Sequence, residues 1–189
     1  MPRISAPTVA EHRIVQRAAL LSAVKEILLS SGADAVTARS AAERAGLARS
    51  SFYEYFASRD EAIVAVAIEA FREWGAEIEQ ALQEVEPAEK LGAYITTNLM
   101  MAADGKHRIA SILQKIELTP ERHEDIIALH DTLVGPLIQI VRELDSSRPV
   151  IDISLVRGLL NAGMQLVEQG SDADEVATRI REVLHRGMT

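Results

Sequence analysis

Apolar residues recur at three- and four-residue steps along most of the chain, and this period limits the fold more than any other feature. The first such stretch starts near Glu11, runs through Ile14, Leu21 and Leu28, and breaks at Gly32. No stretch shows the sustained alternation of a half-buried strand. Of the 189 residues, 48% are hydrophobic but only 4% are aromatic, a composition that favours helices. The sequence therefore predicts an all-α fold.

Glycines, prolines and capping residues divide this pattern into about nine helices. We expect a flexible arm over residues 1–10. The capping chemistry of Thr37, Ser58 and Asp152 suits helix starts, and Pro136 is expected to interrupt the helix that contains it. The expected helices cover roughly residues 11–31, 38–45, 49–55, 59–85, 88–103, 105–116, 120–144, 152–169 and 172–185.

The stretch "AAERAGLARSSFYEYF", residues 41–56, contains four of the chain's seven aromatic residues. A short helix, a turn at Gly46 and another short helix is the plan of a DNA-reading helix-turn-helix. Gly46 can adopt the left-handed conformation of such a turn, and Phe52 and Phe56 would anchor the second helix in the core. Its other side offers arginine, serine and tyrosine, which can contact base edges and phosphates.

Residues 37–61, "TARSAAERAGLARSSFYEYFASRDE", resemble the DNA-binding signature of TetR-family transcriptional regulators. The likeness extends over residues 11–61 and includes a threonine cap, the glycine turn, the aromatic helix end and a charged start to the next helix. It implies that double-stranded DNA is contacted by Thr37, Arg39, Arg49, Ser50, Ser51, Tyr53, Glu54, Tyr55 and Arg59.

Four residues depart from the family pattern, among them Ser50, where glycine is common, and Ala41, where isoleucine or leucine usually fills the core. Ala48 stands where a capping serine or threonine is usual, so the third helix is expected to lack a side-chain cap. Glu54 is an acid on a helix that faces DNA, where it can accept a hydrogen bond from cytosine or pair with a nearby arginine. Residues 1–60 carry eight Lys and Arg against six Asp and Glu, whereas the remaining 129 residues carry 12 against 22. A weakly basic head on an acidic body directs one end toward phosphates.

The resemblance also implies two domains, a helix-turn-helix DNA-binding domain over residues 11–58 and a helical effector-binding and dimerisation domain over residues 59–189. Tyr94 and Asn98 place a phenol and an amide on an otherwise apolar stripe, as in a ligand cavity with a few polar groups. The alternative is that neighbours in the core satisfy these groups. The predicted ligand-binding residues are Trp74, Tyr94, Asn98, Met101, His107, Gln114 and His130.

The helix expected over residues 152–169 is apolar on more than one side, and a helix of this kind near a chain end needs a partner beyond its own core. A twofold homodimer is the commonest solution. The alternative is that the last two helices complete the core of the monomer. The predicted dimer-interface residues are Leu155, Leu159, Ala162, Gly163, Leu166, Ile180 and Leu184.

The sequence contains no convincing set of catalytic or metal-binding residues. The five histidines are scattered, cysteine is absent, and residues 182–185 hold the only Glu-x-x-His motif. The His-Glu-x-x-His zinc motif and a glycine-rich phosphate loop are both missing. We therefore expect neither an enzyme nor a cofactor or metal site. Without a signal peptide or an apolar run of about 20 residues, we expect a cytoplasmic protein with no membrane partner.

Together these features predict a ligand-responsive transcriptional regulator. In its most specific form, it is a homodimeric repressor that binds a roughly palindromic operator and is released by a small-molecule effector. The alternative is an all-α dimer that binds a small molecule or a protein without useful DNA affinity. Glu54, Ala48 and the formal net charge of −8 favour that alternative.

Overall fold

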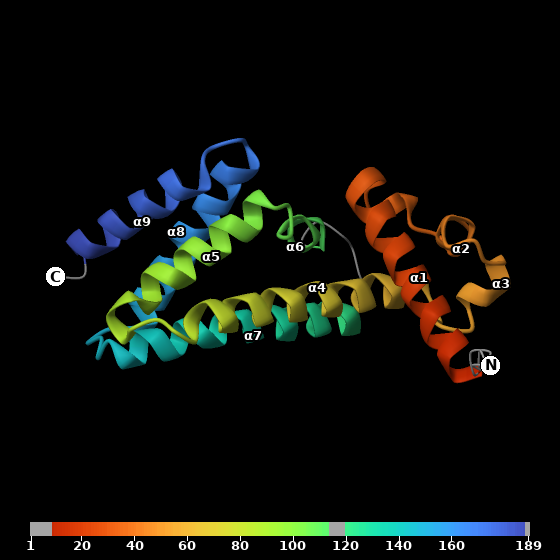
Figure 1. The fold of residues 1–189 in the computed structure, drawn as a ribbon, viewed down its shortest axis with the longest axis horizontal. Coiled ribbons are helices and arrows are strands. Elements are labelled where there is room, and N and C mark those ends of the chain that lie inside the picture. Colours follow the sequence, from red (N-terminus) through yellow and green to blue (C-terminus); the bar gives the residue numbers. More distant parts are fainter. Residues whose placement is uncertain (1–8, 114–119, 188–189) are drawn as a thin grey trace, which may run out of the picture. The chain divides into compact units, whose positions relative to one another are not determined.

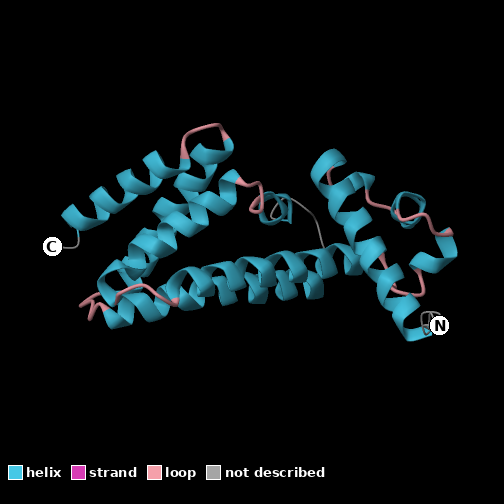
Figure 2. Ribbon diagram, viewed as in Figure 1, coloured by secondary structure: helices cyan, strands magenta, loops and turns pink. Residues whose placement is uncertain are grey.

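The computed structural model describes residues 9–113 and 120–187, apart from the side chains of residues 9, 113, 120–123, 125–132 and 187. Within this part of the chain all regular structure is helical, as predicted (Figure 2). Contacts divide the chain into two compact units, Met1–Ile68 with Ile109–Asp125 and Glu69–Arg108 with Ile126–Thr189. The boundary between the units thus lies inside a helix, ten residues beyond the predicted domain start at Arg59.

The amino-terminal unit is built on one long helix and two short ones (Figure 1). Its core is formed by the buried side of the long helix together with Phe52, Phe56 and the fully buried Ala41 and Ala42. Because the two alanines are small, the second helix can pack closely on the first. The elements are α1 (Val9–Ser31), the short 3-10 turn η1 (Ala33–Ala35), α2 (Ala38–Arg44), α3 (Arg49–Phe52) and the start of α4 (Arg59–Leu82).

The first half of α1 does not contribute to this core. Ile14 is 69% exposed and Val15 is 66% exposed, whereas Leu20 is completely buried. The apolar period of the sequence includes Ile14, but the helix continues past the end of the core it packs on. Burial in α1 therefore begins at Leu20.

The carboxy-terminal unit is a bundle in which α5, α8 and α9 pack together and α4 runs alongside α7 (Figure 1). Gly163 lies where three of these helices meet. A Cβ atom at this position would stand 2.8 Å from Ile180 Cδ1 and 3.0 Å from Leu99 Cδ2, so a larger residue would require these side chains to shift. The elements are the rest of α4, the 3-10 turn η2 (Pro87–Glu89), α5 (Lys90–Ala103), α7 (Pro120–Glu143), α8 (Pro149–Glu168) and α9 (Ala173–Gly187), with α6 (Arg108–Leu113) at the boundary between the units.

One detail of this unit differs from the sequence-based expectation. The helix expected from residue 152 begins instead at Pro149, since proline suits the first helical position and needs no hydrogen bond from its nitrogen there. Asp152 lies in the first turn and accepts a hydrogen bond from the Ser146 hydroxyl. Pro136 lies inside α7, which runs to Glu143, close to the expected end at residue 144, and a bend at Pro136 stays a prediction.

Candidate functional site

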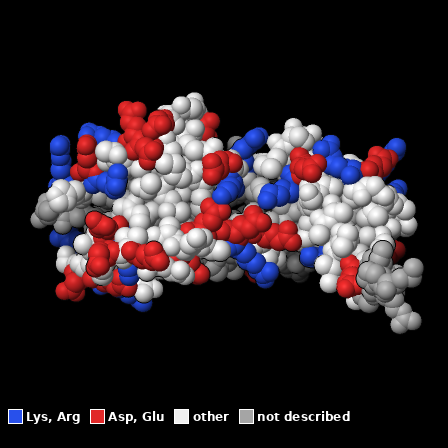
Figure 3. Space-filling view, viewed as in Figure 1, with Lys and Arg blue, Asp and Glu red and all other residues white. Residues whose placement is uncertain are grey.

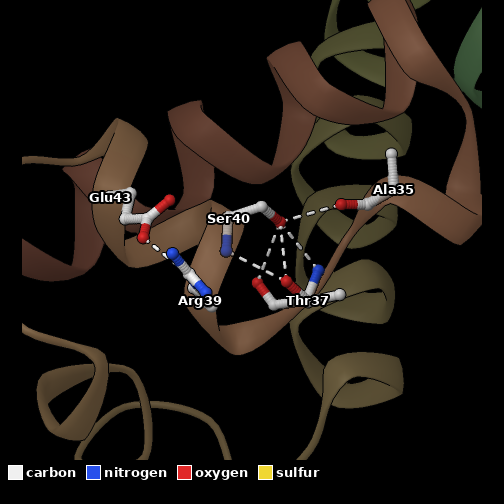
Figure 4. Close-up of polar contacts among 5 residues, drawn as sticks. All are labelled: Ala35, Thr37, Arg39, Ser40 and Glu43. Carbon is white, nitrogen blue, oxygen red and sulfur yellow. Dashed lines mark hydrogen bonds and ion pairs between the residues drawn. The ribbon is translucent and has the colours of Figure 1, made fainter.

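The start of α2 is fixed by reciprocal hydrogen bonds between Thr37 and Ser40 (Figure 4). Thr37 Oγ1 accepts a bond from the Ser40 amide at 3.0 Å, and Ser40 Oγ accepts one from the Thr37 amide at 2.9 Å. The Ser40 hydroxyl also donates to the Ala35 carbonyl at 2.8 Å. This is the capping-box arrangement, which satisfies amides that the helix itself leaves unpaired. The predicted Thr37 cap is confirmed, and it sets the angle at which α2 leaves η1.

The turn between α2 and α3 follows the predicted plan. Gly46 has φ +70°, a left-handed conformation that side chains rarely adopt. The Leu47 amide donates to the Ala42 carbonyl at 2.9 Å, which closes the end of α2. Ala48 precedes α3 with no side-chain cap, as expected from its departure from the family pattern. The position of α3 therefore depends on its buried residues rather than on a cap.

The aromatic residues of α3 and the following turn divide between core and surface. Phe52 is fully buried and Phe56 is 2% exposed, whereas Tyr53 is 53% exposed. Arg49, Ser50 and Glu54 are exposed, and Ser51 and Tyr55 are half-buried. The structure thus brings a cation, two hydroxyl groups and a carboxylate onto one short segment with an apolar anchor beneath it. Such a segment can place side chains at base edges and phosphates.

Tyr55 has a hydrogen-bond partner that the sequence pattern did not indicate. Its hydroxyl donates to Gln16 Oε1 of α1 at 2.7 Å. On either side of this bond, the Arg13 guanidinium lies 5.7 Å from the centre of the Tyr55 ring, and that of Arg17 lies 5.5 Å from the centre of the Phe56 ring. The sequence analysis missed these three α1 residues. The available signal was the four-residue spacing of Arg13 and Arg17 on an otherwise solvent-facing helix.

The two other predicted phosphate-binding arginines are paired within the unit. Arg39 Nε lies 2.7 Å from Glu43 Oε1, and both side chains are exposed (Figure 4). Arg59 donates to the Ala33 carbonyl at 2.8 Å and lies 3.3 Å from Asp60 and 3.9 Å from Asp34. Arg59 therefore holds the start of α4 against η1, and contact with DNA stays a prediction for both arginines.

The start of α4 carries a second confirmed cap. Ser58 Oγ accepts a hydrogen bond from the Glu61 amide at 3.1 Å, and Glu61 Oε2 accepts one from the Ala57 amide at 2.6 Å. Farther along α4, Glu69 and Glu73 are exposed, and Figure 3 shows carboxylates gathered over the middle of this helix. The negative charge makes this part of α4 electrostatically unsuited to phosphates.

Four of the predicted ligand-binding residues lie in the core of the carboxy-terminal unit. Trp74 Nε1 donates to Asn98 Oδ1 at 3.1 Å, and the Asn98 amide donates to the Tyr94 carbonyl at 2.7 Å. The Tyr94 hydroxyl donates to the Leu133 carbonyl at 3.3 Å, and its burial raises the pKa of the phenol to about 12. Asn98 is the one buried polar residue among those described, and Met101, three residues later in α5, is 3% exposed.

His107 lies at the edge of this cluster. Its ring meets the Trp74 ring edge-on with centres 5.3 Å apart, and its Nδ1 lies 2.9 Å from Glu168 Oε1 of α8. The next residue back, Lys106, pairs with Glu77 of α4 at 2.6 Å. The turn between α5 and α6 is thus fastened to two other helices. The remaining predicted ligand residues, Gln114 and the His130 side chain, lie outside the described residues.

The predicted dimer residues fall on different faces of α8 and α9. Gly163 is buried, Ile180 is 6% exposed and Leu184 is 8% exposed, so these three pack inside the unit. Leu155 is 57% exposed and Leu166 is 47% exposed. An outward apolar stripe on α8 is formed by Ile151, Leu155, Leu159, Ala162 and Leu166.

The described residues contain one helix that is long and apolar enough to cross a bilayer. It is α8, with a mean hydropathy of 1.3 and 28% of the relevant window buried. Arg157 lies within it and would cost about 3 kcal/mol at a bilayer centre. Its buried side packs against α5 and α9, as expected of a helix in a globular bundle. In the same part of the chain, no group of three or more His, Cys, Asp or Glu side chains could hold a metal ion.

Comparison with known proteins identifies the amino-terminal unit. A family model described as "Bacterial regulatory proteins, tetR family" matches residues 20–66. No curated protein matches the chain. The family match marks a DNA-binding regulator rather than an enzyme, in agreement with the sequence analysis.

Solved structures with the same fold match nearly the whole chain. The fatty acid degradation regulator FadR from Bacillus halodurans superposes with a TM-score of 0.75 at 16% identity, over 89% of this chain and 94% of its own. FadR from Bacillus subtilis, in complex with stearoyl-CoA, gives 0.75 at 18% identity over 88% and 96%. The TetR-family regulator PfmR from Thermus thermophilus gives 0.68 at 23% identity over 94% and 99%. At these identities the likeness shows that the chain has their fold.

Proposed function

The chain is a TetR-family transcriptional regulator, and from this premise we propose that it is a cytoplasmic, homodimeric repressor released from its operator by a small-molecule effector. The observation that carries the proposal is the exposed segment of α3. Arg49, Ser50 and Tyr53 project from it while Phe52 and Phe56 hold it in the core. In a helix-turn-helix this segment is the one that enters the major groove.

Within the proposal, residues 11–58 bind DNA and residues 59–189 sense the effector and form the dimer. We call residues 49–56, which comprise α3 and the turn after it, the reading segment. Two reading segments related by a twofold axis would bind half-sites about 34–36 Å apart, one helical turn of DNA. The operator is therefore roughly palindromic. Effector binding would favour a dimer conformation in which the two reading segments no longer match successive major grooves. Effector binding and DNA binding are then linked through the equilibrium between the two dimer conformations.

The outward stripe of α8 supports the dimer. Leu155 and Leu166 expose large apolar side chains at its two ends, with the small residues Gly158 and Ala162 between them. A contiguous apolar stripe is costly in water and is typical of an interface. A second copy with the same stripe could pack closely at the small residues.

We further propose that the effector is a largely apolar molecule held among α4, α5 and α7. Trp74, Tyr94, Asn98 and Met101 offer an apolar surface with few neutral hydrogen-bonding groups. FadR from Bacillus subtilis, which shares the fold, binds stearoyl-CoA. Fatty acids and fatty acyl-CoA esters of graded chain length are accordingly the first molecules to test, by their effect on thermal unfolding and on a preformed DNA complex.

The deciding experiment is selection of genomic fragments by the purified protein at low salt, followed by footprinting. We expect protection of a palindromic site. We also expect Arg49→Ala to lower the affinity by about 1–3 kcal/mol and to relax the preference at one base position in each half-site. A reporter joined to the selected site would then show higher expression without the regulator than with it. Lower expression would identify an activator instead.

The second candidate is a ligand- or protein-binding dimer without useful DNA affinity. Exposure of Glu54 on the reading segment favours it, because a carboxylate near phosphates weakens binding unless it accepts a hydrogen bond from a cytosine amino group. Failure to retain any fragment at low salt would favour this candidate. Restored retention in a Glu54→Gln variant would identify the carboxylate as the cause.

A further inference from the structure

The first half of α1 extends beyond the part of the chain that matches the tetR family. The helix begins at Val9, whereas the match begins at residue 20. Residue 20 is also where burial in α1 begins, because Ile14 and Val15 are mostly exposed and Leu20 is fully buried. The extension therefore contributes little to the hydrophobic core. Its position must be explained by the other contacts that it makes.

The contacts of Arg13, Gln16 and Arg17 reach the carboxyl end of the reading segment. Gln16 Oε1 accepts the Tyr55 hydroxyl hydrogen bond at 2.7 Å, and this contact joins residues 39 positions apart in the chain. The Arg13 guanidinium lies over the Tyr55 ring, and the Arg17 guanidinium lies over the Phe56 ring. Figure 1 shows the amino-terminal part of α1 in the same unit as α3, close to the chain that leaves it. The extension and the reading segment thus form one continuous surface.

The position of the two guanidinium groups over aromatic rings suits phosphate binding. A guanidinium over a ring face can still donate its five N–H groups to oxygen acceptors. Contact with the ring also restricts the arginine side chain before DNA binds, so less freedom is lost on binding. The two arginines lie four residues apart and hence on the same side of the helix.

Three other arginines of this unit are less available than Arg13, Arg17 and the exposed Arg49. Arg39, Arg44 and Arg59 each lie within ion-pair distance of a carboxylate, those of Glu43, Glu26 and Asp60 respectively. No ion pair to Arg13 or Arg17 is formed by any carboxylate of the described residues. Within that part of the chain, the positive charge of the extension is therefore not taken up by a direct ion pair.

We propose that the α1 extension is part of the DNA interface, with Arg13 and Arg17 as phosphate contacts and with Tyr55 as a positioning residue that holds Gln16 and both arginines in place. This inference rests on the proposed function, since it presupposes that α3 meets duplex DNA. It changes the predicted role of Tyr55, whose hydroxyl binds the protein rather than the nucleic acid. The extension adds affinity that does not depend on base sequence.

The test measures binding to a random-sequence duplex several helical turns long, across a range of salt concentrations. Each phosphate contact contributes about 0.9 to the slope of log K against log salt, so a dimer loses about 1.8 for Arg13→Ala or Arg17→Ala and about 3.6 for the double variant. The matched control is Arg72→Ala, which removes an exposed arginine of α4 in the carboxy-terminal unit. If the salt slopes of Arg13→Ala and Arg17→Ala both equal that of Arg72→Ala, the proposal is overturned.

The role of Tyr55 is tested by Tyr55→Phe and Gln16→Ala, which remove the same hydrogen bond from its two ends. We expect both to weaken DNA binding and flatten the salt dependence to a similar degree, and the double variant to be no weaker than either single one. Thermal unfolding of the free protein serves as the check on folding. If Tyr55→Phe weakens binding while Gln16→Ala does not, the hydroxyl contacts DNA directly and the positioning role is wrong.

Arg49→Ala separates this inference from the proposed function. If the unsubstituted protein retains no DNA, the proposed function fails and the inference fails with it. In a second outcome, the unsubstituted protein binds its selected site, Arg49→Ala weakens that binding, and substitution of Arg13 and Arg17 leaves it unchanged. In that case only the α1 extension is excluded from the DNA interface. If Arg49→Ala and the substitutions of Arg13 and Arg17 all weaken DNA binding, both the proposed function and the role of the α1 extension are supported.

Discussion

Gly163 offers the sharpest test of the packing in the carboxy-terminal unit. A methyl group at this position would lie 2.8 Å from Ile180 Cδ1, 3.0 Å from Leu99 Cδ2 and 3.2 Å from Val176 Cγ1. Real Cβ atoms essentially never approach as closely as the first of these distances, so the surrounding side chains must move. Since three side chains converge from α5 and α9, all three must shift together to admit the methyl group.

The magnitude follows from two opposing effects. Replacing a helical glycine by alanine stabilises the helix by about 1 kcal/mol. Forcing extra volume into a packed core costs about 1–3 kcal/mol. For Gly163→Ala the net effect is thus a loss of roughly 0–2 kcal/mol, and Gly163→Val should lose more because it adds volume and a branched β-carbon.

Gly75→Ala, inside α4 of the same unit, is the matched control. The nearest atom to the place where its Cβ would stand is Leu133 Cδ2 at 3.9 Å, an ordinary contact, so only the helix-propensity gain of about 1 kcal/mol applies. The two alanine variants should then differ by about 1–3 kcal/mol in the free energy of unfolding, the core-packing cost alone. This difference is more reliable than either value by itself.

Urea unfolding followed by tryptophan fluorescence measures this difference. The chain has one tryptophan, Trp74, which is 7% exposed and reports on this unit. All variants should be compared at one protein concentration, because dimer dissociation would otherwise shift the midpoints. If Gly163→Ala proves as stable as Gly75→Ala, the three helices do not approach at Gly163 as described.

Three further predictions concern the caps, the dimer and the buried phenol. Thr37→Ala removes the cap of α2 and should lower the free energy of unfolding of the amino-terminal unit by about 1 kcal/mol, measured by circular dichroism. Leu155→Glu and Leu166→Glu place charges on the outward stripe of α8 and should convert the dimer to monomers in sedimentation experiments without loss of helix content; an unchanged sedimentation coefficient would exclude the stripe as interface. The pKa of Tyr94 is raised to about 12 in the folded protein, so the folded state keeps a proton that the unfolded state releases above its ordinary value near 10. Stability should accordingly fall by up to about 1.4 kcal/mol per pH unit between these values, and Tyr94→Phe should remove that part of the slope.

Features fixed by short-range chemistry could be predicted from the sequence. Thr37 and Ser58 cap helices, and Gly46 turns the chain, because each depends on neighbours within a few residues. The missing cap at Ala48 could be predicted for the same reason. The assignment of Phe52 and Phe56 to the core followed from their register with the glycine turn. Local pattern was sufficient wherever the interaction partners were close in the chain.

The contacts between α1 and the reading segment could not be predicted in this way. Tyr55 and Gln16 are 39 residues apart, and the period of α1 continues past the core to include the exposed Ile14. Nothing in a helical period shows where the packing partner ends. The hydroxyl of Tyr55 was equally suited to a phosphate and to an amide side chain. Only the fold distinguishes these two acceptors, by placing Gln16 within reach.

The two apolar stripes of α8 show the same limit and lead to a stronger argument for the dimer. From sequence, Val156, Leu160 and Gly163 were no different in kind from Leu155 and Leu166. In the structure the first set is buried against α5 and α9, and the second remains in solvent. The core of the unit is thus already complete on one side of the helix. The alternative that α8 only finishes the monomer's core would leave the outward leucines without a packing role, whereas pairing with a second copy accounts for both stripes at once.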